Sequence, residues 1–285
     1  MTARPSKIPN FHVRRLSRKL AELRTKAGLT QKDPYETTKI DFRRIWRFEN
    51  GEQIPRFVEL NALLDLYGVP SFEWEPYHDM WNAARQKGWW HGQPLRNIDF
   101  VANEQEASHI RDVQLTYVPE LLQTEEYARR VLDTCVPPMS NNRLSVELAS
   151  RPVRQQRLDA ESPVKLHALI YQPVIHARVD KAQLRLLADR ADQANVTLQI
   201  LPRMDEPHGA LAGSFTLLSF PDRDEPDLGY TSEPLGLKMS DDPEMTTELG
   251  RIFKALARRS KSPEESRAYL DKLLNQRHLA GTGIR

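Results

Sequence analysis

Residues 27–55, AGLTQKDPYETTKIDFRRIWRFENGEQIP, decide the fold of the first part of the chain. Thr30 stands three residues before Asp33, a spacing at which two side chains cap the start of a helix. Asp41 can cap a following helix over residues 42–49. The stretch therefore predicts a short helix and, after a brief turn, a second one.

The two sides of this second helix differ in chemistry. We expect Ile45 and Phe48 to face inward, with Trp46 as a third candidate. The outward side carries Phe42, Arg43 and Arg47, and Arg44 lies to the side, where it is better placed for a phosphate. Because arginine pairs with guanine O6 and N7, an exposed helix start rich in arginine suits the major groove of DNA.

The sequence around this stretch continues the helical pattern. Apolar residues between Val13 and Lys26 fall at helical spacing, Gly28 then supplies a stop, and further helical segments run to Tyr67. Residues 1–70 carry 14 Lys and Arg against 8 Asp and Glu, whereas the rest of the chain carries 27 against 31. A basic front part favours a nucleic-acid contact at one end, although many domains differ this much by chance.

The whole chain has 285 residues, enough for two domains, of which 39% are hydrophobic and 28% charged. It has no run of about 18 apolar residues and no secretory signal. The single cysteine, Cys135, cannot form an internal disulfide or a cysteine-based zinc site. We expect a cytoplasmic protein without a membrane span, metal or other cofactor.

Residues 13–70 resemble the Xre-type helix-turn-helix domain of phage repressors and many bacterial regulators. The resemblance rests on Gly28-Leu29-Thr30-Gln31, Glu49-Asn50-Gly51, Pro55 and the run at 63–69. It implies that Gln31 contacts a DNA phosphate and that Arg24 pairs with Glu49, the alternative being that these charges are merely solvated. The expected DNA-binding residues are Gln31, Asp41, Phe42, Arg43, Arg44, Arg47 and Asn50.

Several positions depart from that family pattern. Tyr35 stands where a small residue is expected because two helices cross closely, and Lys39 stands where glycine is common. Pro34 falls inside the expected first short helix, where it removes a backbone donor. These departures leave open a domain that has kept the fold and lost DNA binding.

Beyond residue 102 the patterns predict a mixed α/β domain. Helices are expected over residues 103–114, 124–133, 144–158, 181–194, 244–259 and 263–275. Strands are expected over residues 166–170, 196–201 and 215–220, with a further candidate over 228–231. The strand–helix–strand order between residues 166 and 201 favours this class.

This rear part resembles the C-terminal domain of a large actinomycete group of Xre-type regulators, often described as antitoxin-like. The resemblance rests on motifs such as Val118-Pro119-Glu120-Leu121-Leu122-Gln123-Thr124 and Ser262-Pro263-Glu264-Glu265-Ser266, and Glu120 departs from the usual glycine. It implies a regulator often encoded beside a small partner protein. Candidate effector or partner residues are Arg151, Arg154, Arg157 and His208, although helix-surface arginines usually face water.

The expected organisation is α+β overall, an all-α front followed by a mixed α/β rear. Its parts are a flexible basic arm (1–10), the helix-turn-helix domain (11–70), a Trp-rich helical connector (71–102), the α/β domain (103–279) and a frayed tail (280–285). No catalytic motif is recognisable, and a loop at 205–208 is more simply a solvated turn than a metal or acid–base site.

The sequence thus predicts a sequence-specific DNA-binding transcriptional regulator, homodimeric and not an enzyme. Its rear domain would bind a partner or an effector. The alternative is a protein-interaction module with a vestigial helix-turn-helix, which sequesters a small partner protein.

Overall fold

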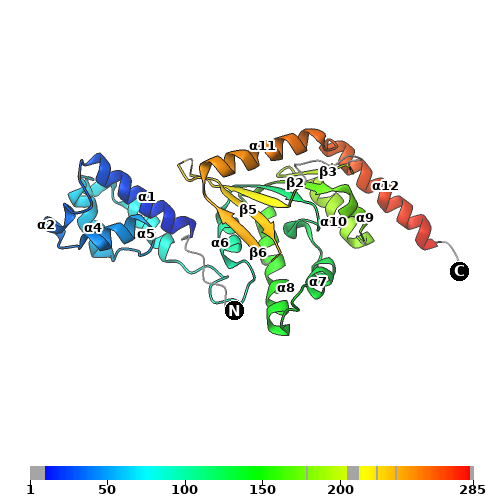
Figure 1. Cartoon of the computed structure of the whole chain (residues 1–285), viewed down its shortest axis with the longest axis horizontal. Coiled ribbons are helices and arrows are strands. Elements are labelled where there is room, and N and C mark those ends of the chain that lie inside the picture. Colours follow the sequence, from blue (N-terminus) through cyan, green and yellow to red (C-terminus); the bar gives the residue numbers. More distant parts are fainter. Residues whose placement is uncertain (1–9, 178, 204–211, 223, 235, 283–285) are drawn as a thin grey trace. The chain divides into compact units, whose positions relative to one another are not determined.

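The computed structural model describes residues 10–282 except 178, 204–211, 223 and 235 (Figure 1). The chain forms two compact units, which divide after His91. The expected connector, residues 71–102, is therefore shared between the two units. The expected arm lies outside the described residues except for Asn10. The expected frayed tail began at residue 280, but the last helix continues to Thr282, and residues 283–285 lie outside the described residues.

The first unit is all helical. Its elements are α1 (Phe11–Lys26), α2 (Pro34–Thr38), α3 (Phe42–Glu49), α4 (Phe57–Leu66), η1 (Ser71–Glu73) and α5 (Glu75–Arg85). Asn10 caps α1 by accepting a hydrogen bond from the Val13 amide at 3.0 Å. After α1, Gly28 adopts the left-handed φ of 72° that ends the helix and turns the chain.

One apolar core holds these helices together. Leu16 and Leu20 of α1 meet Ile45 and Phe48 of α3, together with Leu60, Leu63 and Leu64 of α4. α5 packs on α1, and Trp81 joins the same core while its indole nitrogen donates to the Pro55 carbonyl at 2.7 Å. The predicted inward positions Ile45 and Phe48 are each only 1% exposed, whereas Trp46 is 44% exposed. The inward assignment of Trp46 was wrong, because it lies one residue past Ile45 and so points about 100° away around the helix.

The start of α2 differs from the sequence prediction. The helix begins at Pro34, so the proline occupies its first position and not its interior. There the missing backbone donor costs nothing, since the first amides of a helix have no partner within it. The Asp33 carboxylate accepts a hydrogen bond from the Thr30 amide at 2.5 Å, in the turn that precedes the helix.

The second unit combines a sheet with helices. Its helices are α6 (Ile98–Glu106), η2 (Glu120–Leu122), α7 (Glu125–Asp133), α8 (Asn141–Gln155), η3 (Gln156–Leu158), α9 (Gln172–His176), α10 (Lys181–Ala191), α11 (Pro243–Arg259) and α12 (Pro263–Thr282). Its strands are β1 (His109–Gln114), β2 (Lys165–Tyr171), β3 (Val196–Leu201), β4 (Phe215–Ser219), β5 (Leu228–Glu233) and β6 (Gly236–Ser240).

Among the described residues these strands form one six-stranded sheet of order β3-β2-β1-β4-β5-β6. β1, β2 and β3 run parallel, and β4, β5 and β6 are joined antiparallel. Helices connect β1 to β2 and β2 to β3, as parallel neighbours require, whereas β5 leads directly into β6 as a hairpin. The predicted α+β class, an all-α front followed by a mixed α/β rear, is confirmed.

The two faces of the sheet are covered by different helices (Figure 1). Val113 of β1 and Leu217 of β4 pack against Leu249 and Phe253 of α11. Because side chains alternate along a strand, Asp112 and its cross-strand partner Thr216 point to the opposite face, which α6 and α8 cover. This second face carries the polar groups considered below.

One sequence prediction in this unit was wrong, and an α-helix and a strand were missed. Residues 109–114 were expected to continue a helix from residue 103, yet α6 ends at Glu106 and β1 follows. The short helix α9 and the strand β6 were not predicted at all. Arg111 explains the first error, since this charged strand residue is neutralised by Asp227, with 2.5 Å between Nη2 and Oδ2.

Candidate functional site

The exposed side of α3 collects the side chains that the sequence places at DNA. The Asp41 carboxylate caps the helix by accepting a hydrogen bond from the Arg43 amide at 2.8 Å. Arg43 and Arg47 are exposed, and Phe42 is 42% exposed. Trp46, half-exposed, lies beside them on the same helix. α3 is therefore a short helix with a buried apolar side and an outer side of arginine and aromatic groups.

Arg44 is engaged inside the unit. Its guanidinium binds Glu59 of α4 with both arms, Nη1 at 2.7 Å and Nη2 at 3.0 Å. The Glu59 side chain is only 6% exposed. Burial alone would raise the pKa of Glu59, but hydrogen bonds from Arg56 and the charges of Arg44 and Arg56 hold it below its usual value. Arg44 therefore links α3 to α4, and it shares the Glu59 carboxylate with Arg56.

A second bidentate pair joins the end of α1 to the end of α3. Arg24 donates from Nε to Glu49 Oε1 at 2.6 Å and from Nη2 to Oε2 at 2.9 Å, and its Nη1 donates to the Leu29 carbonyl. The side-chain amide of Gln31 also donates from Nε2 to Glu49 Oε2, at 2.6 Å. The hydrogen bond to Glu49 raises the pKa of Arg24. The network fixes Gln31 in the turn before α2.

The remaining front positions behave as parts of the scaffold. Asn50 donates from its side chain to the Trp46 carbonyl at 2.8 Å and ends α3. Lys39 adopts a left-handed φ of 56°, the conformation for which glycine is common at this position. The Tyr35 ring is 49% exposed, so it does not fill the space between the helices. The departures at Tyr35 and Lys39 are thus accommodated without loss of the helical arrangement.

In the second unit, two arginines of α8 do not face water. Arg151 and Arg154 are only 5% and 3% exposed. Arg154 binds Glu104 of α6 with two hydrogen bonds, at 2.6 and 2.8 Å, and donates to Glu120 of η2 at 2.7 Å. Arg151 donates to the same Glu120 at 2.9 Å. These four residues form a charge cluster that ties α6, η2 and α8 together.

Arg157 has a different role. Its guanidinium donates to the carbonyls of Glu104, Gln105 and Ala107 at the end of α6. It therefore satisfies the last carbonyls of a helix, which have no partner within it. The candidate residue His208, like the loop 205–208, lies outside the described residues.

The charge cluster forms part of the wall of a cavity of about 510 Å³. α6, β1, η2, α7, α8 and the β5–β6 hairpin line it. Asp112 lies on its β1 wall and is 7% exposed. Burial raises the pKa of Asp112 to about 7, the nearby charges of Glu120 and Glu104 add to the rise, and hydrogen bonds from Gln114 and Thr216 oppose it. Asp112 was not among the predicted site residues, because residues 109–114 were expected to be helical.

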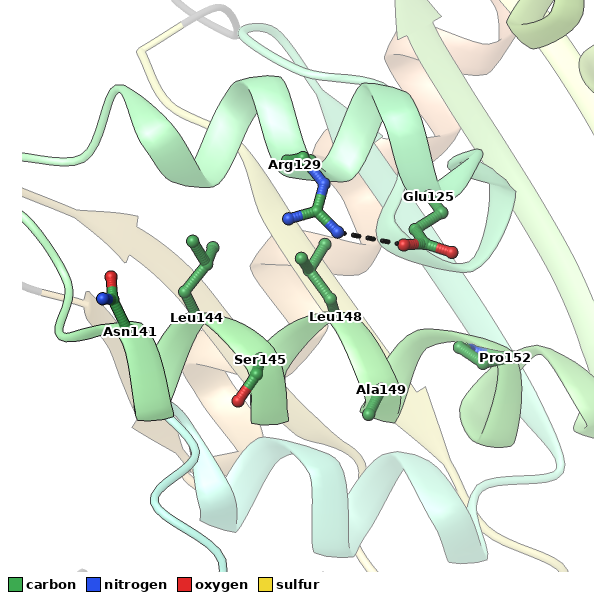
Figure 2. Close-up of a pocket in the computed structure, with 8 residues that line it drawn as sticks. All are labelled: Glu125, Arg129, Asn141, Leu144, Ser145, Leu148, Ala149 and Pro152. Carbon is green, nitrogen blue, oxygen red and sulfur yellow. Dashed lines mark hydrogen bonds and ion pairs between the residues drawn. The ribbon is translucent and has the colours of Figure 1, made fainter.

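A second hollow lies between α7 and α8, and its volume is about 470 Å³. Leu144 and Leu148 point from α8 toward α7, where Arg129 and Glu125 form an ion pair at 3.1 Å (Figure 2). None of the buried polar atoms left without a hydrogen-bond partner in the described residues lies on this groove. It is an apolar groove with an exposed ion pair at its rim.

Comparisons with known proteins agree with the division of the chain into two units. Residues 15–73 match a family model described as a helix-turn-helix domain, so the first unit carries a domain of that class. Residues 98–272 match the model described as Domain of unknown function (DUF5753). This match covers more than half of the chain, which therefore belongs to that family. No curated protein and no solved structure matches the chain.

The residues that the structure describes hold no group of three or more His, Cys, Asp or Glu side chains able to share a metal ion. Among the same residues, no helix is both long enough and apolar enough to cross a bilayer.

Proposed function

We propose that the chain is a sequence-specific DNA-binding transcriptional regulator whose α3 enters the major groove. The observation that carries this proposal is the outer side of α3, where Arg43 and Arg47 are exposed on a helix that Ile45 and Phe48 anchor in the core. A groove-reading helix needs both properties, because its side chains must be free while its backbone is held.

The roles of the residues follow from their surroundings. Arg43 and Arg47 are the candidates for guanine, and Phe42 offers an apolar contact to a thymine methyl group. Gln31 remains the candidate for a phosphate, since one of its amide hydrogens is used by Glu49 and the amide carries two. Arg44 is assigned to the scaffold, not to a phosphate.

Binding to the DNA upstream of the chain's own coding sequence tests the proposal. A phosphate-contacting regulator loses affinity steeply with salt, by a slope of about −0.9 per phosphate neutralised. The double variant Arg43→Ala, Arg47→Ala should lower specific affinity at least tenfold. Arg258→Ala, an exposed arginine of α11, is the matched control and should leave binding unchanged.

Absence of salt-dependent DNA binding in the folded protein would favour the alternative, an interaction module that sequesters a partner. Under the main proposal, the second unit binds an effector or a small partner protein, as expected for an antitoxin-like regulator. We also propose that the protein is cytoplasmic and has no enzymatic activity. We further propose a homodimer, because paired helix-turn-helix domains bind two half-sites about one helical turn apart. Sedimentation that shows a monomer with and without DNA would contradict the dimer.

A further inference from the structure

The cavity of the second unit has an unusual balance of charge. Its wall carries the charge cluster, in which the two arginines Arg151 and Arg154 are matched by the two carboxylates Glu104 and Glu120. Asp112 is a further acid on this wall, and it is almost completely buried. The cluster therefore has no positive charge left to compensate Asp112.

Glu147 adds to the same imbalance. It lies on the cavity wall, is 7% exposed, and accepts a hydrogen bond from the backbone amide of Arg96 at 2.5 Å. Arg96 also lines the cavity, and its exposed guanidinium donates to the Pro234 carbonyl at 3.4 Å. The wall therefore carries three arginines against five carboxylates: Glu104, Asp112, Glu120, Glu147 and Glu233. Since an unpaired buried carboxylate is costly, a cavity with excess acid is stabilised by a ligand that brings positive charge.

The hydrogen bonds around Asp112 leave room for such a ligand. Both donors that reach its side chain, Gln114 at 2.9 Å and Thr216 at 2.9 Å, end on the same oxygen, Oδ1. Oδ2 has no hydrogen-bond partner among the described residues.

Gln123 offers a second open acceptor on the same wall. Its side-chain nitrogen donates to the Val118 carbonyl, while its Oε1 is buried and without a partner in the described residues. Each open group on Asp112 and Gln123 accepts a hydrogen bond and calls for a donor.

From these observations we infer that the cavity binds a small organic cation, a primary amine with an apolar body, whose ammonium group donates to Asp112. The volume of about 510 Å³ is within the usual range for small-molecule sites. Apolar side chains suited to the body of the ligand also line it: Phe100, Val101, Ile110, Leu132 and Met139.

The main competing ligand would be an anion held by Arg151, whose Nε is buried without a partner. The pairing of Arg151 and Arg154 with carboxylates argues against it, because an anion would have to displace Glu120 or accept its charge as a neighbour. The experiment below separates the two ligand classes directly.

The test is titration calorimetry of the intact chain without DNA, with hexylamine, hexanol and hexanoate as probes. They differ only in the head group, which is positive, neutral or negative. Hexylamine should bind at least tenfold more tightly than the other two. Asp112→Asn should remove this preference, because a neutral amide cannot compensate the ammonium charge. Asp189→Asn, at an exposed position of α10, is the matched control and should keep the preference.

Cys135, the only cysteine of the chain, provides a second measurement because it lies on the cavity wall. Hexylamine should slow its alkylation by uncharged iodoacetamide in the wild type and not in Asp112→Asn. Val131→Phe, which places a larger side chain at the cavity wall, should weaken binding of every probe even if Asp112→Asn fails to fold.

Several results would overturn the inference. They are equal binding of hexanol, tighter binding of hexanoate, unchanged amine binding in folded Asp112→Asn, and no amine binding at millimolar concentration. The inference rests on the proposed effector role of the second unit, but its test needs no DNA. Loss of DNA binding with intact amine binding would reject the regulator and leave the cavity assignment standing.

Discussion

Arg24 and Glu49 lie 25 residues apart in the chain and face each other through two hydrogen bonds, so that the last turn of α1 is fastened to the last residue of α3. Their side chains are 15% and 5% exposed. The contribution of this pair to stability should therefore lie between that of a surface ion pair, which is small, and that of a fully buried pair, whose disruption is costly.

Glu49→Ala should lower the free energy of unfolding of the first unit by about 2 kcal/mol, between the ~0–1 of an exposed pair and the ~3–5 of a broken buried pair. All five tryptophans lie before residue 92, so tryptophan fluorescence reports this unit within the intact chain. Glu22→Ala, which removes the exposed partner of Lys19, is the control and should cost less than 1 kcal/mol. Equal effects of the two variants would show that the Arg24–Glu49 pair does not hold the unit together.

Arg44→Ala should act on stability and not on the salt dependence of DNA binding. It leaves the buried Glu59 with only the exposed Arg56, at a cost of about 1–3 kcal/mol. Because the guanidinium of Arg44 is bound to Glu59 and not free for a phosphate, the slope of log affinity against log salt should stay unchanged at temperatures where the variant is folded. A flatter slope would return Arg44 to the phosphate role expected from the sequence alone.

Lys39→Gly should stabilise the first unit by about 0.5–1 kcal/mol, because Lys39 holds a left-handed φ of 56° that glycine adopts without steric cost. Thermal unfolding followed by tryptophan fluorescence measures the change. Thr37→Gly, in the preceding turn of α2, should instead destabilise by up to about 1 kcal/mol. If both glycines destabilise alike, the left-handed geometry at Lys39 is not present in solution.

Asp112→Asn should change how stability depends on pH. The folded-state pKa of Asp112 is raised to about 7 from an ordinary 3.8. Between these values the unfolded chain has released the proton and the folded chain holds it, so wild-type stability falls as pH rises through this window. The full cost above pH ~7 is on the order of 4 kcal/mol.

The asparagine variant should therefore match the wild type near pH ~4 and exceed it near pH ~8. Far-UV circular dichroism is the suitable measurement, because fluorescence reports the other unit. Asp189→Asn, at an exposed position, is the control, and its stability relative to the wild type should not change with pH. A pH-independent difference between wild type and Asp112→Asn would contradict the raised pKa.

Sequence patterns predicted the helices of the first unit because their apolar residues recur at helical spacing and their ends carry recognisable caps. They failed at β1, where Ile110 and Val113 are three residues apart and so fit a helix as well as a strand. Arg111 and Asp112 between them argue against a buried strand until their partners are known. Asp227 and Thr216, which accommodate these two residues, lie more than 100 positions further along the chain.

The charge cluster was also hard to predict, because its members lie far apart in the sequence. Spacing placed Arg151 and Arg154 on one side of a helix, but it could not say that this side is buried, since burial depends on Glu104 in a different helix. Glu120 was visible in the sequence as a charged residue where the group usually has glycine. The structure gives that departure a physical reason, because its carboxylate binds both arginines. A glutamate where the group usually has glycine is thus a signal in the sequence that could have pointed to a basic partner.

The sequence preference of the proposed regulator should depend on Arg43 and Arg47. Both are exposed on α3, one helical turn apart, whereas Arg44 between them is bound to Glu59. A bidentate arginine–guanine contact contributes about 1–3 kcal/mol of discrimination. Arg43→Ala and Arg47→Ala should each relax preference at separate base pairs, measured by competition with operators substituted one base pair at a time. Gln31→Ala should instead weaken all sequences about equally, since a phosphate contact carries no sequence information. If neither arginine variant changes any base preference while the protein still binds DNA, α3 does not read the groove, and another element of the first unit must do so.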